Sequence, residues 1–362
     1  MGEYTIAVLA GDGIGPEVTA EAERALQAIA RRYGHTFRLK PALVGQAAIA
    51  AEGAPLSAAT IALCQASDAV LFGAVGTLDA PVTASGARHE SAILRLRKEL
   101  DLFANLRPVR VLPGVADASP VRAERLDGVD LLVIRELTGG LYFGRPSEIH
   151  EGAHGADTVD TMAYTEAEIE RVVRAACEFA RARHGRVASV DKANVLSCSR
   201  LWRRVAIRVA TDYPDVELQH LLVDACAMEL LRRPAQFDVI VTENLFGDIL
   251  TDEASMLVGS LGMLPSASLG ARQTAHGRFG LYEPIHGSAP DIAGQGKANP
   301  IAAILSAALL LRYSLSLETE ARAIENAIAS VLADGLRTAD MRADSGGALS
   351  TSQMGEAIAK RI

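Results

Sequence analysis

Strand-like apolar segments alternate with amphipathic segments along most of this chain of 362 residues. The first kind has the β-branched, continuously apolar character of buried strands and covers residues 5–10, 69–75, 130–136, 187–192, 216–224 and 238–244. The second kind has the apolar period of a helix and covers residues 17–32, 57–66, 90–101, 165–184, 199–211 and 318–334. This alternation predicts an α/β fold.

The length of the chain favours two domains, because a single hydrophobic core stops growing beyond about 250–300 residues. No repeat and no low-complexity linker marks a boundary between domains. Two arrangements therefore stay open: two domains joined end to end, or one domain inserted within the other.

Composition excludes several classes of partner. The net charge is −8 and the pI is about 5.6, which argues against a nucleic-acid-binding surface. No signal peptide is recognisable in MGEYTIAVLAGDG, and the apolar run 301–311 is too short to span a membrane and predicts a buried helix. None of the four cysteines lies in a Cys-x-x-Cys pair, so we expect reduced thiols and a cytoplasmic protein without nucleic-acid or membrane partners.

The glycine-rich turn GDGIGP, residues 11–16, invites a dinucleotide-binding interpretation. Its spacing is Gly-x-Gly-x-Gly rather than Gly-x-Gly-x-x-Gly, and Asp12 and Glu17 place negative charge where a pyrophosphate would lie. The next predicted strand, residues 36–44, supplies no acidic residue for a ribose. We interpret the motif as a tight turn, with Pro16 in the first helical turn.

Two carboxylates stand four residues apart in FGDILTDEAS, residues 246–255, where they repel each other on a helix. Gly247 marks the break after the preceding strand, and the apolar pattern predicts a helix from Asp248. Asp248 and Asp252 then share one face and suit a hard divalent cation, although Asp248 alone also fits a helix cap. Asp224 ends the predicted strand 216–224, and strand ends are where α/β proteins bind ligands.

Several basic residues lie near predicted strand and helix ends. Arg97, Arg107 and Arg135 could together hold a small polycarboxylate, since a guanidinium fork matches a carboxylate. Lys192 ends a predicted strand and could act as a base. Taken alone, each residue favours a structural role: a solvated or salt-bridged arginine, a surface lysine for Lys192, and a core or surface tyrosine for Tyr142.

Seven segments together resemble one protein family. They are GDGIGPE, LRKELDLFANLRPV, RELTGGLYFG, VDKANVL with SRLWR, LLVDACAM, FDVIVTENLFGDILTDEAS and EPIHGSAPDIAGQGKANP, between residues 11 and 300. The chain is similar to the β-hydroxyacid oxidative decarboxylases, the isopropylmalate and isocitrate dehydrogenase group. The resemblance implies a two-domain fold with a central mixed sheet flanked by helices, not a Rossmann fold. It implies a cofactor-binding domain, 1–102 with 262–362, and an inserted substrate, metal and dimerisation domain, 103–261.

The resemblance also implies roles for the polar residues. Arg97, Arg107 and Arg135 match the substrate-carboxylate clamps. Asp224, Asp248 and Asp252 match ligands of Mg²⁺ or Mn²⁺, which would relieve the repulsion between carboxylates. Lys192 and Tyr142 match the catalytic base and acid. In this family a homodimer shares its active sites, so Lys192 and Asp224 would face the partner subunit.

The segment 286–300 matches the family's cofactor loop. The residues that would lie along the adenosine half of NAD are His286, Gly287, Ser288, Ala289, Asp291 and Asn299. A carboxylate at Asp291 would accept hydrogen bonds from the ribose hydroxyls and repel a 2′-phosphate, so NAD is the expected cofactor. Glu90 matches a residue near the nicotinamide, but the stretch 76–90 departs from the family pattern, with His89 where proline is usual.

The reaction that the resemblance implies is NAD-dependent oxidative decarboxylation. VDKANVL followed by SRLWR most resembles the isopropylmalate branch, which implies 3-isopropylmalate as the substrate and leucine biosynthesis as the pathway. Ile93, Leu94 and Val195 would line the pocket for its alkyl group, since apolar side chains disfavour a further carboxylate. The alternatives are a sister enzyme for tartrate or malate, homoisocitrate or another alkylmalate, and a non-catalytic regulatory subunit.

Overall fold

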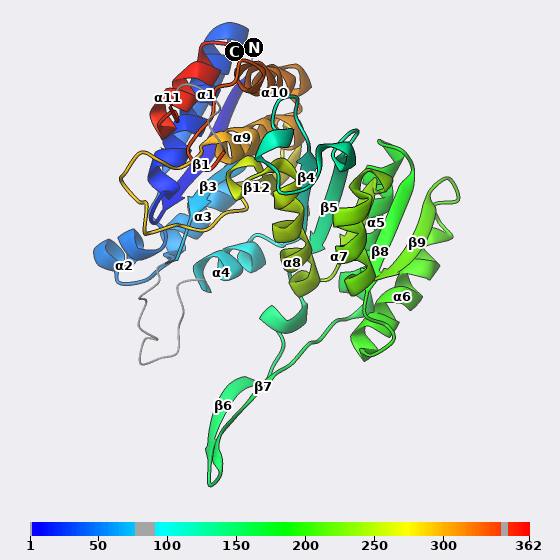
Figure 1. Cartoon of the computed structure of the whole chain (residues 1–362). Coiled ribbons are helices and arrows are strands. Elements are labelled where there is room, and N and C mark those ends of the chain that lie inside the picture. The colour runs from blue at the N-terminus through cyan, green and yellow to red at the C-terminus, as the bar shows by residue number, and fades with distance from the viewer. Residues whose placement is uncertain (1, 77–90, 342–346) are drawn as a thin grey trace. The chain divides into compact units, whose positions relative to one another are not determined.

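The computed structural model describes residues 2–76, 91–341 and 347–362, and it divides into two compact units (Figure 1). Unit 1 comprises Met1–Leu102, Val111–Pro120 and Val258–Ile362, apart from the residues outside that description. Unit 2 comprises Phe103–Arg110 and Val121–Leu257. Each unit has strands between helices, so the α/β prediction is confirmed. The predicted assignment of functional domains stays a prediction.

The strands of unit 1 run in the order β2-β1-β3-β12-β11. β1 pairs in parallel with β2 and β3, β3 pairs in parallel with β12, and β12 pairs antiparallel with β11. The strand bounds are β1 Glu3–Gly11, β2 Thr36–Pro41, β3 Ala69–Ala74, β11 Pro265–Gln273 and β12 Arg278–Pro284. This mixed pairing makes unit 1 an α/β unit with one antiparallel edge.

The helices of unit 1 pack their apolar side chains against both faces of these strands. α9 is buried along almost its whole length and packs on β11, β12, α1 and α10, as expected for a helix apolar on all sides. The bounds are α1 Gly15–Tyr33, α2 Gln46–Glu52, α3 Ala58–Ala66, α4 Ser91–Glu99, α9 Ile301–Tyr313, α10 Glu318–Ala333 and α11 Thr351–Ala359, with the short turn η6 Leu261–Met263. No helix in the described part of the chain is long and apolar enough to cross a membrane, and the cytoplasmic location stays a prediction.

The strands of unit 2 run in the order β4-β5-β10-β8-β9. β4 and β5 are antiparallel, whereas β5, β10, β8 and β9 are parallel. The bounds are β4 Leu102–Arg110, β5 Asp130–Glu136, β8 Arg186–Asp191, β9 Glu217–Leu222 and β10 Val239–Thr242. Because parallel strands end at one edge, the segments after β5, β8 and β10 meet there, and these segments carry Tyr142, Lys192, Asp248 and Asp252.

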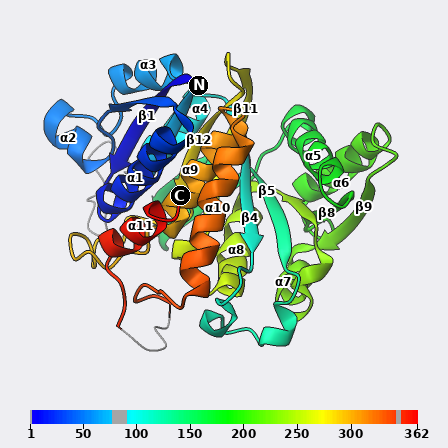
Figure 2. The ribbon, with the colours of Figure 1, turned by 90° about the horizontal axis from the view of Figure 1, so that it is seen from above.

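Helices cover both faces of the unit 2 strands. Figure 2 shows the pair α5 and α6 on one face and the pair α7 and α8 on the other. The bounds are α5 Glu166–Arg181, α6 Ser197–Ala210, α7 Val223–Arg232 and α8 Asn244–Ser255. A hairpin of β6 Ser147–Gly152 and β7 Gly155–Asp160 extends from this unit with every residue exposed, and the one-turn helix η3 Gly140–Tyr142 precedes it.

Candidate active site

Helix α8 carries the predicted metal carboxylates, and it begins four residues earlier than the sequence predicts. Glu243 is its N-cap, and its carboxylate accepts hydrogen bonds from the N–H groups of Leu245 at 3.1 Å and Phe246 at 2.8 Å. Asp248 therefore lies in the second turn, so the interpretation of Asp248 as a helix cap is wrong. The carboxylate pair needs another explanation.

Gly247 lies inside α8, so the prediction that it marks the break after the strand is also wrong. A Cβ at this position would lie 2.6 Å from Cγ of Arg135 and 2.8 Å from its Cβ. A separation under about 3 Å leaves no room for a methyl group. Glycine here allows the helix to lie directly against the arginine side chain.

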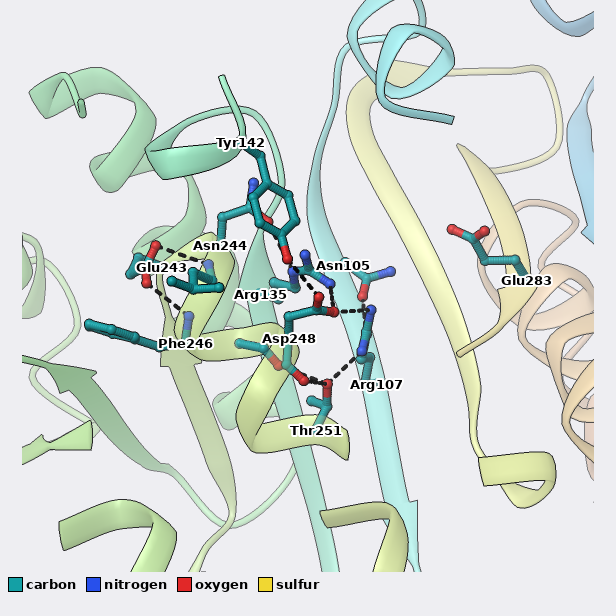
Figure 3. Close-up of polar contacts among 12 residues, drawn as sticks. Asn105, Arg107, Arg135, Tyr142, Glu243, Asn244, Phe246, Asp248, Thr251 and Glu283 are labelled. Atoms are coloured by element: carbon teal, nitrogen blue, oxygen red, sulfur yellow. Dashed lines mark hydrogen bonds and ion pairs between the residues drawn. The ribbon is translucent and has the colours of Figure 1, made fainter. Parts of the chain in front are cut away.

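Arg107 and Arg135 are buried and converge on Asp248 (Figure 3). Arg135 Nε donates to Asn244 Oδ1 at 3.0 Å, and its Nη1 forms an ion pair with Asp248 Oδ1. Arg107 Nη2 lies 3.5 Å from the same oxygen. The structure thus brings together two predicted substrate arginines and one predicted metal ligand.

Side chains that the sequence analysis did not single out fix the two guanidinium groups. Arg107 Nε donates to Asn105 Oδ1 at 2.6 Å, and its Nη1 donates to Thr251 Oγ1 at 2.5 Å. Asn105 and Arg107 are two apart on β4 and share a face, which is a signal that the sequence did contain. The contact between Thr251 and Arg107 depends on the fold, because 144 residues separate them.

Asp252 lies one helical turn beyond Asp248 and is exposed. Its carboxylate makes no hydrogen bond or ion pair with any residue that the structure describes. Desolvation and then the charge of Asp248 raise its pKa, while Arg107 and Arg135 act in the opposite direction. An acidic group with this electrostatic environment would be stabilised by an added cation.

Tyr142, at the end of η3, also contacts Asp248 and Arg135. Its hydroxyl donates to Asp248 Oδ2 at 2.7 Å, and the guanidinium carbon of Arg135 lies 5.4 Å from the centre of its ring. Desolvation and the hydrogen bond to Asp248 raise the pKa of Tyr142 to about 12. The phenol therefore keeps its proton at neutral pH, as a proton donor must.

Lys192 and Asp224 form a second pair in unit 2. Lys192 follows β8 directly, and its Nζ forms an ion pair with Asp224 Oδ1. β9 ends at Leu222, so Asp224 lies in the first turn of α7 rather than at a strand end, which corrects the prediction. The hydrogen bond from Lys192 lowers the pKa of the Asp224 carboxyl.

The three predicted metal ligands do not form one cluster within this single chain. Across residues 2–76, 91–341 and 347–362, no group of three His, Cys, Asp or Glu side chains is placed to hold one metal ion. The assignment of Asp224, Asp248 and Asp252 to one ion, shared across a homodimer, stays a prediction.

Arg97 belongs to unit 1, where it lies in α4. It forms a buried ion pair of 2.9 Å with Glu283, a partner that the sequence analysis did not identify. Its Nε is buried and has no hydrogen-bond partner in the described chain. One guanidinium edge is thus held by the protein, and one buried donor stays available.

The predicted specificity residues have different environments. Ile93 packs against the buried core of unit 1, whereas Leu94 is half-buried outside that cluster. Val195, in unit 2, is 62% exposed. Glu90 lies outside the described residues. Leu94 in unit 1 and Val195 in unit 2 are thus each at least partly accessible, and their role in specificity stays a prediction.

The predicted cofactor loop is held by the glycine-rich turn after β1. The N–H of Ile14 donates to the carbonyl of Ser288 at 2.8 Å, and the Ser288 hydroxyl donates to the carbonyl of Gly76 at 2.6 Å. Gly13 has φ +57°, and a Cβ there would lie 2.0 Å from the Ser288 oxygen. The interpretation of GDGIGP as a tight turn is confirmed, and its role in unit 1 is to support this loop.

Two features of the loop suit a bound nucleotide. The Nε2 atom of His286 is buried without a hydrogen-bond partner in the described chain, and desolvation lowers the pKa of this imidazole. Ala289 has φ +37°, a left-handed conformation that is unusual for a residue with a side chain, while Gly287 and Asp291 are exposed. The loop thus holds a neutral histidine with one free ring nitrogen.

Asn299 ends the loop and is buried. Its Nδ2 donates to Asp340 Oδ2 at 3.1 Å, and its Oδ1 accepts from the N–H of Ile301 at 3.0 Å. The Ser260 hydroxyl also donates to Asp340 Oδ2. The Asn299 side chain is therefore occupied by protein contacts.

Comparison with known proteins identifies relatives of this chain. Residues 5–358 match the protein family described as isocitrate/isopropylmalate dehydrogenase. The 3-isopropylmalate dehydrogenase of Priestia megaterium is 58% identical over 98% of this chain and 94% of that protein. The 3-isopropylmalate dehydrogenase of Anaeromyxobacter dehalogenans is 56% identical over 99% of both proteins.

Solved structures of two relatives have the same fold. Isocitrate dehydrogenase from Methylococcus capsulatus superposes with a TM-score of 0.86 at 35% identity, covering 99% of both chains. A β-decarboxylating dehydrogenase from Thermococcus kodakarensis superposes with a TM-score of 0.78 at 37% identity, covering 99% of this chain and 96% of that one. On the strength of the match across almost its full length, the chain belongs to the isocitrate/isopropylmalate dehydrogenase family.

Proposed function

We propose that this chain is an NAD-dependent dehydrogenase that oxidises 3-isopropylmalate at C2 and releases one carboxylate as CO₂, forming 2-oxo-4-methylpentanoate in leucine biosynthesis. The observation that carries the proposal is the arrangement around Asp248. Two buried arginines, a protonated tyrosine and the unpaired carboxylate of Asp252 surround it. The names of the relatives agree with this activity.

The arginines supply the binding site for a diacid. Nε of Arg107 and Nε of Arg135 each donate to an amide oxygen, which fixes both guanidinium planes. Nη2 of Arg107 and Nη1 of Arg135 point at Asp248. A substrate carboxylate forms charge-assisted, bidentate hydrogen bonds with such groups, and Arg97 of unit 1 would supply a third guanidinium.

The charges of the cluster balance before any ligand binds. Asp248 and Asp252 offset Arg107 and Arg135, and Asp224 offsets Lys192. A divalent cation together with a dianionic substrate adds no net charge, so the two would bind best together. This exchange of partners would release the arginines to the substrate and the aspartates to the metal.

The carboxylates suit Mg²⁺ or Mn²⁺, which prefer oxygen ligands. Asp248 and Asp252 would hold the ion from one subunit, and Asp224 from the partner. The unpaired charge of Asp252 and its raised pKa support this assignment. Such an ion, when bound, stabilises the negative charge that develops as CO₂ leaves.

Lys192 and Tyr142 would transfer the protons. Lys192 would take the proton of the C2 hydroxyl while the hydride of C2 would pass to NAD, and for this the amine would have to leave its ion pair with Asp224. Tyr142 then protonates the enolate carbon at C3. Its pKa of about 12 keeps the phenol protonated until that step.

NAD would bind along residues 286–300. The free Nε2 of His286 is a buried polar atom that a nucleotide could satisfy, and the exposed Asp291 can accept hydrogen bonds from ribose hydroxyls. The same carboxylate would repel the 2′-phosphate of NADP. Steady-state rates should therefore favour NAD over NADP, and Asp291→Arg should reduce that preference.

A homodimer would complete the site. α7 and α8 pack against each other and expose Met228, Leu231 and Ile249, which are 64%, 46% and 57% exposed. Isolated exposed apolar residues are common, but these share one helix pair with the aspartates of the site. An apolar contact between copies there would bring Asp224 of one subunit toward the partner's site.

The experiment that tests the proposal is NADH formation with a panel of 3-substituted malates, in the presence and absence of Mn²⁺. 3-Isopropylmalate should give the highest kcat/KM, and chelation should abolish the rate. Alkyl groups that differ by one methylene should be separated by only about tenfold to 200-fold. A higher kcat/KM for tartrate or homoisocitrate would assign the chain to a sister enzyme, and no turnover on the whole panel would contradict enzymatic activity.

A further inference from the structure

We propose that Tyr164 and Asn244 are positioning residues that hold the substrate arginine Arg135 and the acid Tyr142 in register. This inference rests on the proposed function, because it assigns a purpose to side chains behind the proposed active site. Neither residue is among the predicted ligands or proton carriers. Both lie in unit 2, together with every group they contact below.

Asn244 links two catalytic elements through its side chain. Its Oδ1 accepts from Arg135 Nε at 3.0 Å, and its Nδ2 donates to the carbonyl of Gly139 at 3.1 Å. Gly139 immediately precedes η3, which ends at Tyr142. The Asn244 amide thus donates to the tyrosine loop and accepts from the arginine, a combination that a carboxylate or an apolar side chain lacks.

Tyr164 holds Asn244 from behind. Its hydroxyl accepts the backbone N–H of Asn244 at 3.0 Å and donates to Glu243 Oε2 at 3.3 Å. Glu243 caps α8, so one hydroxyl ties together the first residues of the helix that carries Asp248 and Asp252. Burial raises the pKa of the Glu243 carboxyl, so loss of this hydrogen bond would leave a poorly solvated acid.

The ring of Tyr164 also sets the course of the tyrosine loop. A Cβ on Gly139 would lie 2.5 Å from its Cε1, and a Cβ on Gly140 would lie 2.6 Å from its hydroxyl oxygen. Gly140 has φ +78°, and its N–H donates to the carbonyl of Ala163 at 2.9 Å. The Gly-Gly pair thus allows the loop to pass directly over the ring.

Glu136 fixes the other end of the same loop. It is fully buried and accepts from the N–H of Thr138 at 2.8 Å and the N–H of Gly139 at 2.8 Å. Beyond this fixed end, the side chains of Asn244 and Tyr164 contact Gly139 and Gly140, next to the backbone bond of Gly140 with Ala163. We therefore expect Asn244 and Tyr164 to influence the distance from the Tyr142 hydroxyl to Asp248.

The test is a double-mutant cycle of Tyr164→Phe with Tyr142→Phe. Tyr164→Phe keeps the ring over the glycines and removes only the hydroxyl. We expect kcat for 3-isopropylmalate with Mn²⁺ to fall at least about tenfold, since a misplacement of about 1 Å can cost far more, while KM for NAD changes less than about twofold. In the Tyr142→Phe background the same change should cost clearly less, because the residue acts through Tyr142.

Tyr213→Phe is the matched control, because it removes the hydroxyl of another buried tyrosine of unit 2. Tyr213→Phe should leave kcat unchanged. Tyr164→Phe and Tyr213→Phe should both keep the far-UV circular dichroism spectrum of the parent. Should Tyr164→Phe fail to fold, Asn244→Asp tests the same link, since it keeps an acceptor for Arg135 and loses the donor to Gly139. Fully additive effects, or a parent-like kcat in both variants, would overturn the inference. A parent-like Tyr142→Phe would remove Tyr142 as the acid and the inference with it, whereas no turnover by the parent chain would overturn the proposed function instead.

Discussion

At the scale of single residues, the protonation of Tyr142 is the feature most closely tied to chemistry. Desolvation and the contact with Asp248 raise its pKa to about 12, against an ordinary value of 10.0. Raising the pKa of a phenol extends the pH range in which it carries a proton. We therefore predict that the tyrosinate absorbance of Tyr142, taken as the difference between the protein and Tyr142→Phe, develops only above about pH 11. A difference spectrum that titrates at the ordinary value of 10 would contradict this environment.

Asp252 leads to a prediction about the stability of the fold, because its negative charge lowers the free energy of unfolding. Its raised pKa means that the folded state keeps the proton longer than the unfolded state, so its contribution to the free energy of unfolding falls as pH rises above the ordinary value of 3.8. Metal-free Asp252→Asn should melt at a higher temperature than the parent near neutral pH, and the gain should shrink toward about pH 4. Added Mn²⁺ should stabilise the parent more than the variant. A variant that is less stable than the parent at neutral pH would show that Asp252 has a structural partner.

The carboxylates and arginines were predictable as residues, whereas their immediate partners were not. Asp248 and Asp252 are recognisable as like charges one helical turn apart. The arginines are recognisable by their positions near predicted strand and helix ends. The hydrogen bonds of Asn244 with Arg135 and of Tyr164 with Glu243 join residues 109 and 79 apart. No local pattern encodes such pairs, because they arise only when β5, β10 and α8 assemble.

At the scale of elements, α8 sets the geometry of the site through Gly247. Alanine would favour the helix by about 1 kcal/mol, but its Cβ would lie 2.6 Å from Arg135 Cγ. Because the buried arginine cannot move without losing Asn244 or Asp248, we expect the steric effect to decide. Gly247→Ala should raise KM for 3-isopropylmalate about tenfold or more. KM for NAD is the internal control, since the predicted cofactor loop is held by contacts within unit 1; an unchanged KM for the diacid would contradict the close approach.

The elements themselves were largely predictable where their apolar pattern is continuous. The predicted strand 130–136 coincides with β5, and 187–192 and 238–244 fall on β8 and β10 with small shifts at their ends. The helix 318–334 is found as α10. The hairpin of β6 and β7 was not predicted. Every one of its residues is exposed, so its sequence has no alternation of buried and exposed positions to recognise. The start of α8 was predicted four residues too late. Glu243 caps the helix, but its position in the sequence also fits the end of the predicted strand 238–244.

At the scale of the whole molecule, the proposed homodimer makes the exposed face of α7 and α8 functional. We predict that Met228→Lys weakens self-association at least about tenfold, because a buried charge without a partner costs several kcal/mol. Ile207→Lys is the matched control: Ile207 is 54% exposed on α6, which covers the opposite face of the strands. Sedimentation velocity over a range of concentrations measures both. Equal dissociation in the two variants, or a parent chain that is monomeric, would contradict the dimer face.

The central claim, that α8 binds a divalent ion together with a diacid, is tested most directly by titrating the parent chain and Asp248→Asn with Mn²⁺. The free ion is followed by its paramagnetic resonance signal, with and without 3-isopropylmalate. The parent should bind one ion per chain, and the substrate should tighten binding at least about tenfold because it releases Asp248 from the arginines. Asp248→Asn should lose that coupling while keeping the folded spectrum of the parent. Equal Mn²⁺ binding by the two proteins, with no effect of the substrate, would contradict the account.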